Sequence, residues 1–470
     1  VRYWHYFLVC NAGYWRLIGM TAVTIVSGVS NPGDVTNIPG ISIYHTGVTL
    51  VDYNATTAVG GFISLTSSTA GLRVLSIYVD ESNNVIIFGD AIGVGALAIK
   101  LDSTGALSLS DKITPASNAR STPDGTGNLY ATFTNIDSCC YYYPELVKLS
   151  SSFVKLAGVY NGYGDGYGGP GQPVVDSSGN IWVNQYDGYC GNALFKFDSA
   201  LSTITEYYYG DASGYFSING YAFTSTNNLI NIGGYVDYCS YNFVPVAFSV
   251  SATNPTGTPN WGITGTVYEG KTFAVVKVDT SNNIYISLVC PTVPTFNTLI
   301  KINSSGSLPL AWQYTYTGIN GFYNFSLDSS NNVYVVGTNN TNGFTIIKVN
   351  SSGTLVYSRK LTPAVGYISD FAGTPVITIS GNYIYITASY YPPTGVPQVL
   401  TIKVPTDGTG TQSISVGGYS FTYAVGTVTA SVATESFTTT PISYSGGSIG
   451  AVASFTSVSS LTASTAVTVL

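Results

Sequence analysis

A unit of about 50 residues recurs along most of the chain, and this repeat restricts the possible folds more than any other feature of the sequence. One clear copy is Asp328-Ser-Ser-Asn-Asn-Val-Tyr-Val-Val-Gly337, followed by Thr345-Ile-Ile-Lys-Val-Asn-Ser-Ser-Gly353. Asp, Asn and Gly are typical of tight turns, whereas Val, Ile and Tyr are typical of strands. The unit therefore predicts a turn, a strand, a loop, a second strand and another turn.

Two markers keep the same phase through the repeat. The first is an asparagine just before a β-run, and successive copies are 44, 52, 48, 55, 49 and 50 residues apart. These anchors are Asn84, Asn128, Asn180, Asn228, Asn283, Asn332 and Asn382. The second marker is a lysine inside an apolar run, at Lys100, Lys148, Lys196, Lys301, Lys348 and Lys403, with Ser249 at the equivalent place in the fourth unit. We expect each lysine stem to pack between neighbouring units while its ammonium group reaches solvent.

Seven units of this length are typical of a β-propeller with four short strands per blade. We therefore predict an all-β fold. It is a seven-bladed β-propeller at residues 61–412, with an N-terminal cap or docking segment at 1–60 and a Ser/Thr/Val-rich β tail at 413–470. One blade cannot bury both of its faces alone, so closure of the ring is expected to supply the stability.

The two ends lie outside the repeat. Residues 1–60 suit either a cap on the main body or a docking segment for a larger assembly, and a start at Val1 implies processing or truncation. In the tail, apolar residues fall at every third position from Ile449 to Leu461, a period that suits neither a helix nor a flat strand. We expect an extended or solenoid-like tail that packs on its neighbours. The alternative is a disordered linker, which the many Val and Phe residues oppose.

Charge is scarce, and this excludes two classes of partner. Charged residues make up 8% of the chain, the net charge is −7 and the five arginines are scattered, so no basic patch is available for nucleic acid. Residues 7–29 are fairly apolar, but Arg16 near their middle would cost roughly 2.5–3.5 kcal/mol in a bilayer, which argues against a membrane span. Ser, Thr, Asn, Gly and 38 tyrosines supply the polarity, which suits a protein outside the cell or on a particle surface.

Five of the six cysteines occupy one place in the repeat. Each follows the anchor asparagine of its unit by 7 to 12 residues, in the loop between the second and third strands of a blade, so all five should lie on one face of the ring. They are Cys139, Cys140, Cys190, Cys239 and Cys290. Disulfides within or between these loops would imply oxidising surroundings, and free buried thiols are the alternative.

The same loops are rich in tyrosine. The residues are Tyr141, Tyr142, Tyr143, Tyr186, Tyr189, Tyr238 and Tyr241. Tyrosine has a flat apolar face and a polar tip, which suit stacking on sugars and contacts with proteins. We therefore predict a tyrosine-rich binding rim at the mouth of the propeller, with ordinary loop packing as the alternative.

The sequence offers little support for catalysis. The two histidines, His5 and His45, lie outside the repeats, so Ser-His chemistry has weak support. Loop acids such as Asp165 and Asp187 would serve a glycosidase only as a placed pair. A Cys-x-x-Cys or His pairing that would indicate a zinc site is absent. We predict a non-enzymatic protein with no catalytic residues, no cofactor and no bound metal.

Two stretches of the repeat carry a resemblance to known families. Asp176-Ser-Ser-Gly-Asn-Ile-Trp-Val183 and the Asp328 unit resemble the bacterial β-propeller repeats called SBBP repeats. With Ile346-Ile-Lys-Val-Asn-Ser-Ser-Gly-Thr-Leu355, they also look like repeats in virion proteins of marine tailed phages, cyanophages among them. The tail, through Gly418-Tyr-Ser-Phe-Thr-Tyr-Ala424, resembles the C-terminal regions of those phage proteins. The resemblance implies a structural or adhesive role, as a tail fibre, spike or capsid appendage, although the cysteine-bearing loops are unusual for such proteins.

The expected function is that of a non-enzymatic structural or adhesive virion protein that binds a host surface or neighbouring virion subunits. The expected partners are other virion or assembly subunits and a host surface glycan or protein, in an oligomeric assembly at the virion surface. Two alternatives stay open. One is a bacterial cell-surface or extracellular filament protein, and the other is an enzyme that degrades surface glycans.

Overall fold

The computed structural model describes most of the chain. The described residues are 8–11, 14–17, 51–56, 61–433, 437–439, 448–449 and 455–457, with gaps at 69, 114–115, 137–141, 162–169, 188–190, 203, 209, 212–213, 238–242, 256–258, 266–271, 290–296, 307–309, 339–341 and 369–374. They form strands, turns and bends, and none of them is helical. In this part of the chain, no helix has the length and apolarity needed to span a membrane.

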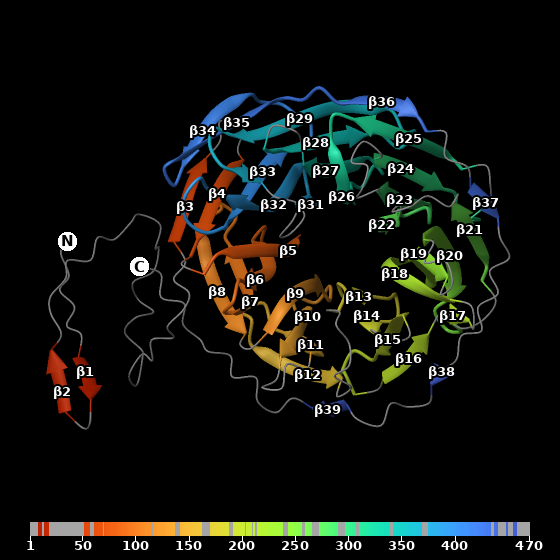
Figure 1. The fold of residues 1–470 in the computed structure, drawn as a ribbon, viewed down its shortest axis with the longest axis horizontal. Helices are drawn as coiled ribbons and strands as arrows, with labels where there is room; N and C mark the ends of the chain where they lie inside the picture. The colour runs from red at the N-terminus through yellow and green to blue at the C-terminus, as the bar shows by residue number, and fades with distance from the viewer. Residues whose placement is uncertain are drawn as a thin grey trace.

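Seven antiparallel sheets surround a central axis, so the predicted seven-bladed β-propeller is confirmed (Figure 1). Blade 1 contains β5 (Leu72–Val79), β6 (Val85–Ala91), β7 (Gly95–Leu101) and β8 (Leu107–Ile113). Blade 2 contains β9 (Ala116–Pro123), β10 (Leu129–Ile136), β11 (Tyr142–Leu149) and β12 (Lys155–Asn161). Blade 3 contains β13 (Val174–Val175), β14 (Ile181–Asp187), β15 (Gly191–Phe197) and β16 (Ile204–Tyr208).

The next three blades repeat this order from the axis outwards. Blade 4 contains β18 (Gly214–Phe223), with the short β17 (Gly210–Asp211) beside it, and then β19 (Asn228–Asp237), β20 (Phe243–Ser251) and β21 (Trp261–Gly265). Blade 5 contains β22 (Thr272–Val278), β23 (Ile284–Val289), β24 (Asn297–Ile302) and β25 (Trp312–Thr317). Blade 6 contains β26 (Asn320–Leu327), β27 (Val333–Thr338), β28 (Phe344–Val349) and β29 (Leu355–Pro363).

Blade 7 joins the two ends of the propeller. Its first three strands are β31 (Val376–Ser380), β32 (Tyr383–Tyr391) and β33 (Gln398–Pro405), and the short β30 (Tyr367–Ile368) also pairs with β32. Its fourth strand is β4 (Phe62–Ser67), from the start of the propeller, and β3 (Val51–Thr56) adds a fifth. The ring therefore closes through hydrogen bonds between segments more than 300 residues apart. A separate hairpin, β1 (Leu8–Asn11) and β2 (Tyr14–Leu17), precedes them.

The β tail forms a belt around the outside of the ring. Its strands are β34 (Gln412–Val416), β35 (Tyr419–Val425), β36 (Thr429–Val432), β37 (Phe437–Thr439), β38 (Ser448–Ile449) and β39 (Phe455–Ser457). β35 pairs with the outer strand of blade 6, and β36, β37, β38 and β39 pair in turn with those of blades 5, 4, 3 and 2. Figure 1 shows these blue strands in that order on the periphery. We call residues 412–457 the belt.

Tight turns explain the Asn-Asn and Gly-Asn pairs of the repeat. In every blade the residue before the anchor asparagine has a φ between 54° and 90°, a region that Gly and Asn tolerate best. These residues are Asn83, Gly127, Gly179, Asn227, Asn282, Asn331 and Gly381. The second strand then leaves the turn with alternate side chains facing the two neighbouring blades. Leu229, for example, packs in the cluster shared with blade 3, and Ile230 packs in the cluster shared with blade 5.

Neighbouring blades also pack a large side chain against a glycine, at the turn between the third and fourth strands. In blade 6 this turn has Gly353, where an added Cβ would lie 2.5 Å from the ring of Tyr314 in blade 5. Gly306 lies in the same way against Trp261 of blade 4. Blades 2 and 3 reverse the pattern, because Phe153 and Leu201 take the positive-φ position and are themselves buried. A large side chain from one blade therefore faces a glycine of the next, or the converse.

Candidate functional site

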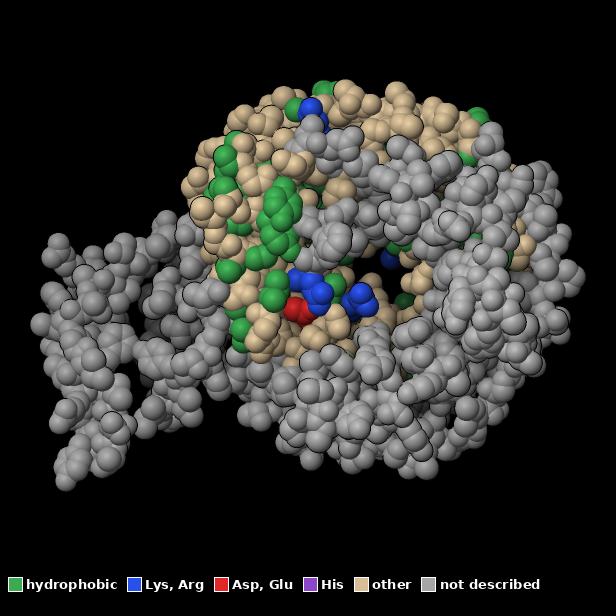
Figure 2. All heavy atoms as spheres, viewed as in Figure 1, with side chains coloured by type: hydrophobic (Ala, Val, Ile, Leu, Met, Phe, Trp, Pro, Cys, Tyr) green, Lys and Arg blue, Asp and Glu red, His purple; other side chains and the backbone are tan. Residues whose placement is uncertain are grey.

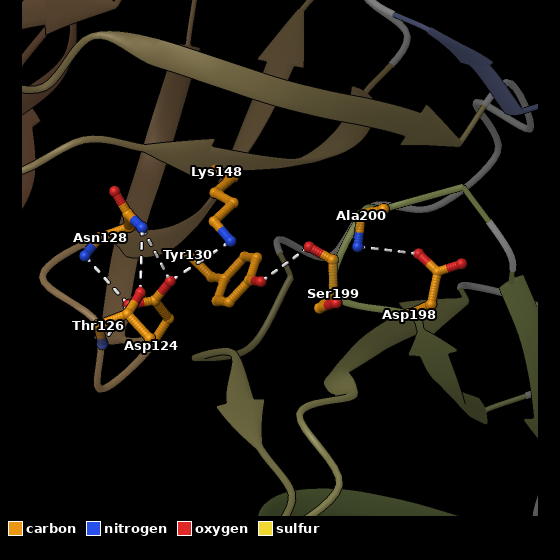
Figure 3. Close-up of polar contacts among 8 residues, drawn as sticks. All are labelled: Asp124, Thr126, Asn128, Tyr130, Lys148, Asp198, Ser199 and Ala200. Carbon is orange, nitrogen blue, oxygen red and sulfur yellow. Dashed lines mark hydrogen bonds and ion pairs between the residues drawn. The ribbon is translucent and has the colours of Figure 1, made fainter.

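The markers of the repeat form one recurring polar cluster. In blade 2, Asp124 accepts hydrogen bonds from the backbone N–H groups of Thr126 and Asn128, at 2.8 and 3.0 Å, and from the Asn128 side chain at 3.2 Å (Figure 3). The Lys148 ammonium lies 3.4 Å from the same carboxylate. The Tyr130 hydroxyl, on the strand that leaves the turn, donates a hydrogen bond to the Ser199 carbonyl of blade 3. We call the Asp, Asn, aromatic and Lys residues of one blade a blade staple.

In blades 2, 3, 5, 6 and 7 the staple lysine lies over an aromatic ring of its own blade. Lys148, Lys196, Lys301 and Lys348 each place Nζ 5.1 Å from the ring centre of the residue opposite them on the second strand. Those partners are Tyr130, Trp182, Tyr285 and Tyr334. Cation–π contacts of this kind are worth about 0.5–2 kcal/mol.

The ammonium groups are partly exposed, as the sequence predicted, and they also reach the next blade, which it did not predict. Lys301 donates to the Ser351 carbonyl of blade 6 at 3.2 Å, and Lys348 donates to the Thr406 carbonyl of blade 7 at 3.3 Å. Lys403 of blade 7 makes the same contact with the Ser103 carbonyl of blade 1, at 3.5 Å. The staple therefore connects blades, including the pair at which the ring closes.

Blade 4 lacks both the lysine and the aromatic residue of the staple. Ser249 replaces the lysine there, and Ile230 stands opposite it in place of an aromatic residue. Blade 1 has Ile86 opposite Lys100, and Lys100 instead lies 3.2 Å from the Asp80 carboxylate. Each staple thus keeps a partner for its cation, which indicates a structural part for these residues rather than a chemical one.

Hydrogen bonds in the staples hold the turn carboxylates in their charged form. For Asp124, desolvation raises the pKa, but donation from Thr126 and Asn128 outweighs it and brings the pKa down to about 2. Burial similarly opposes the shift at Asp176, where donation from Asn180 and Trp182 still lowers the pKa. These carboxylates are fully occupied as acceptors within their own turns.

The five predicted cysteines lie outside the described residues, and so do Tyr141, Tyr189, Tyr238 and Tyr241 of the predicted rim. Tyr142 and Tyr143 lie in strand β11 and Tyr186 lies in strand β14, whereas the sequence predicted all three in loops. The structure describes no side chain of Tyr141, Tyr142, Tyr143, Tyr186, Tyr189, Tyr238 or Tyr241, and Cys139, Cys140, Cys190, Cys239 and Cys290 are not described either. The flanking strands do show where these segments connect. Residues 137–141 join β10 to β11 and residues 238–242 join β19 to β20, in each case the second and third strands of a blade. The binding rim and the disulfides stay predictions.

A cavity of about 740 Å³ occupies the centre of the ring. All seven innermost strands, or the residues beside them, contribute to its lining. The lining is largely polar, with hydroxyl and amide side chains such as Ser76, Thr122, Asn324 and Ser326. Its charged members are Arg120 of β9 and Lys277 of β22, and no acidic residue is among the described residues of the lining. Figure 2 shows Lys or Arg side chains and an acidic side chain gathered at the central opening.

Sequence reasoning missed this channel. Arg120 and Lys277 stand on the innermost strands, which precede the turns and carry neither marker of the repeat. The chain has only 16 Lys and Arg residues, but Arg120 precedes its anchor asparagine by eight residues and Lys277 precedes its anchor by six, so no shared phase marked them in the sequence. In the described part of the chain, no group of His, Cys, Asp and Glu side chains is arranged to hold a metal ion.

Comparisons with known proteins give structural neighbours only. No protein-family model matches the chain, and no curated protein matches it. A protein of unknown function from Dyadobacter fermentans is 10% identical, with a TM-score of 0.41 over 71% of this chain and 98% of that one. The PQQ-bound aldose sugar dehydrogenase from Streptomyces coelicolor is 9% identical, with a TM-score of 0.34 over 74% of this chain and 99% of that one. A subtype N11 neuraminidase-like protein of the A/flat-faced bat/Peru isolate is 13% identical, with a TM-score of 0.36 over 77% of this chain and 98% of that one. At these scores the similarity carries no argument about activity or ligand.

Proposed function

We propose that this chain is a non-enzymatic structural and adhesive protein of a virion, an appendage such as a tail fibre, spike or capsid decoration. The observation that carries the proposal is the double closure of the ring. Blade 7 takes its fourth strand from the start of the propeller, and the belt adds a strand to each of blades 2 to 6.

Pairing of both chain ends with the ring favours a protein that unfolds slowly and stays in place for a long time. The belt pairs with the outer strands of five blades, so part of each of those edges is already hydrogen-bonded within the chain. The ring can open at the junction of blades 7 and 1 only after β4 detaches from β33, and the belt ties blades 2 to 6 to one another, so both ends of the chain slow unfolding. A particle outside a cell cannot replace its damaged subunits, and slow unfolding suits that setting. The resemblance of the repeat and the tail to marine phage virion proteins points the same way.

The ring has two faces, and the connections between the strands indicate which face binds a partner. In an antiparallel blade, the turns from strand one to two and from strand three to four lie on one face, and the loops from strand two to three lie on the other. The staples occupy the turn face. The cysteine- and tyrosine-bearing loops connect strands two and three, so we assign host or subunit contact to the loop face.

Immunogold electron microscopy tests the location. Antibodies against the purified protein would be applied to particles and cells from a culture that produces it. The proposal expects label on the particles. Label confined to the cell envelope or to extracellular filaments would contradict it and favour the cell-surface alternative. Incubation of the protein with host polysaccharide tests the third possibility, because released oligosaccharide would contradict a non-enzymatic role.

A binding assay tests the loop face. Changing Tyr141, Tyr142 and Tyr143 together to Ala should weaken binding to host cells at least tenfold, because aromatic anchors carry most of an adhesive contact. Glu81→Ala is the matched control, since Glu81 is exposed in a turn on the opposite face. Equal binding by the wild type and the tyrosine variant would show that these tyrosines are not part of the binding surface.

A further inference from the structure

The channel carries positive charge in a chain whose net charge is −7. Arg120 and Lys277 project into the cavity from blades 2 and 5. Arg73 of blade 1 lies nearby, but its guanidinium is paired with the Asp90 carboxylate, and its Nε–Oδ2 distance is 3.0 Å. The acid near these cations is therefore already neutralised.

Among the residues that the structure describes, neither channel cation has an acidic partner of its own. Arg120 donates to the Pro170 carbonyl at 3.0 Å, which leaves its charge uncompensated. Lys277 makes no hydrogen bond or ion pair with any residue that the structure describes, and its side chain is exposed to the channel. Uncompensated charge in a confined space costs free energy unless a ligand of opposite sign is bound.

We propose that the central channel binds a carboxylate-bearing sugar. A guanidinium and an ammonium group are the donors that recognise carboxylates best. The hydroxyl and amide side chains of Thr122, Asn324 and Ser326 supply partners for sugar hydroxyls. A cavity of about 740 Å³ falls within the range of small-molecule sites. The site goes beyond the proposed function, because it holds whether the protein belongs to a virion or to a cell surface.

Calorimetric titration of the full chain with sodium glucuronate at low ionic strength tests this site. Glucose and sodium acetate are the matched probes, one without the charge and one without the sugar. We expect glucuronate to bind at least tenfold more tightly than either. Arg120→Gln and Lys277→Gln should each weaken that binding at least tenfold, whereas Lys360→Gln on the outer strand β29 should not change it.

Each result of the titrations overturns a different part of the proposal. Equal affinity for glucuronate and glucose would overturn the role of charge, and equal affinity for glucuronate and acetate would overturn the role of the sugar. Failure of glucuronate to bind the wild type overturns the site. Lys277→Gln keeps the test valid if Arg120→Gln fails to fold, because Lys277 has no partner among the described residues. Immunogold labelling of particles is independent of all these results, so the two proposals can fail separately.

Discussion

At the residue scale, the turn carboxylates are the most sensitive electrostatic points of the ring. Asp124 is held ionised by donors two and four residues ahead of it, and Asp176 and Asp328 repeat the arrangement. The repeat spacing predicted these turns well, because Asp and the anchor asparagine are neighbours in sequence. It did not predict that the aromatic residue six positions after Asp176 or Asp328 also donates to the same carboxylate, at 3.0 Å in both cases.

Acid should therefore destabilise the protein through these groups. The pKa of Asp124 falls from its ordinary 3.8 to about 2 in the folded state, so its contribution to stability is present above pH 3.8 and is lost as the pH falls through 2. We expect the free energy of unfolding to decline between about pH 4 and 2. Chemical denaturation across that range measures it, and Asp124→Asn should show a shallower decline. Identical slopes for the wild type and the variant would contradict the assignment.

A buried amide gives a second residue-scale prediction. Asn231 is fully buried in blade 4, and neither its Oδ1 nor its Nδ2 has a hydrogen-bond partner in the structure. The equivalent position, three residues after the anchor, holds Val183 in blade 3 and Val335 in blade 6. An unsatisfied buried polar group costs about 1–3 kcal/mol. Asn231→Val should raise the free energy of unfolding by about that amount in urea titrations, and a decrease would mean that the amide has a role the structure does not show.

At the element scale, each blade follows the sequence markers while the contacts between blades do not. Strand order and the lysine positions follow from the phase of the repeat, because both are local properties of one unit. The pairing of a glycine with an aromatic side chain joins residues of different blades, such as Gly353 with Tyr314. Local patterns carry no information about such a contact, and the same holds for the presence of both Arg120 and Lys277 in the lining of the channel.

Alanine substitutions at two glycines distinguish the cost of backbone strain from the cost of overpacking. Gly353 and Gly179 have φ values of +90° and +79°, but an added Cβ meets the Tyr314 ring at 2.5 Å in the first case and nothing within 4 Å in the second. Gly179→Ala should cost about 1–2 kcal/mol from the left-handed backbone alone. Gly353→Ala should cost more, since overpacking adds about 1–3 kcal/mol. Thermal or chemical denaturation measures the stability of both variants. Equal losses of stability would argue against the packing of Gly353 on the Tyr314 ring.

At the scale of the whole molecule, ring closure was predictable and the belt was not. Seven similar units with apolar faces favour a closed ring, whereas the belt strands β37, β38 and β39 are only two or three residues long, and the three-residue apolar period of the tail is not that of a strand. Their positions are set by the outer edges of the blades they meet. The tail was expected to be extended and β-rich, and its course from blade 6 to blade 2 emerges only from the assembled ring.

The central claim is that the belt ties blades 2 to 6 together and so helps to hold the ring closed, and the rate of unfolding tests it most directly. β36 pairs with β25 through Ala430 and Ser431, opposite Tyr316 and Thr315, and one of these two residues must direct its N–H group at β25. Tryptophan fluorescence after a jump into guanidinium would compare the wild type with Ala430→Pro and Ser431→Pro, and with Ser431→Val as a control that keeps the N–H group. The account predicts about tenfold faster unfolding for at least one proline variant, since a lost ladder hydrogen bond is worth about 0.5–1.5 kcal/mol, and no change for the valine control. Unchanged unfolding rates for both proline variants would show that the belt lies on the ring without holding it closed.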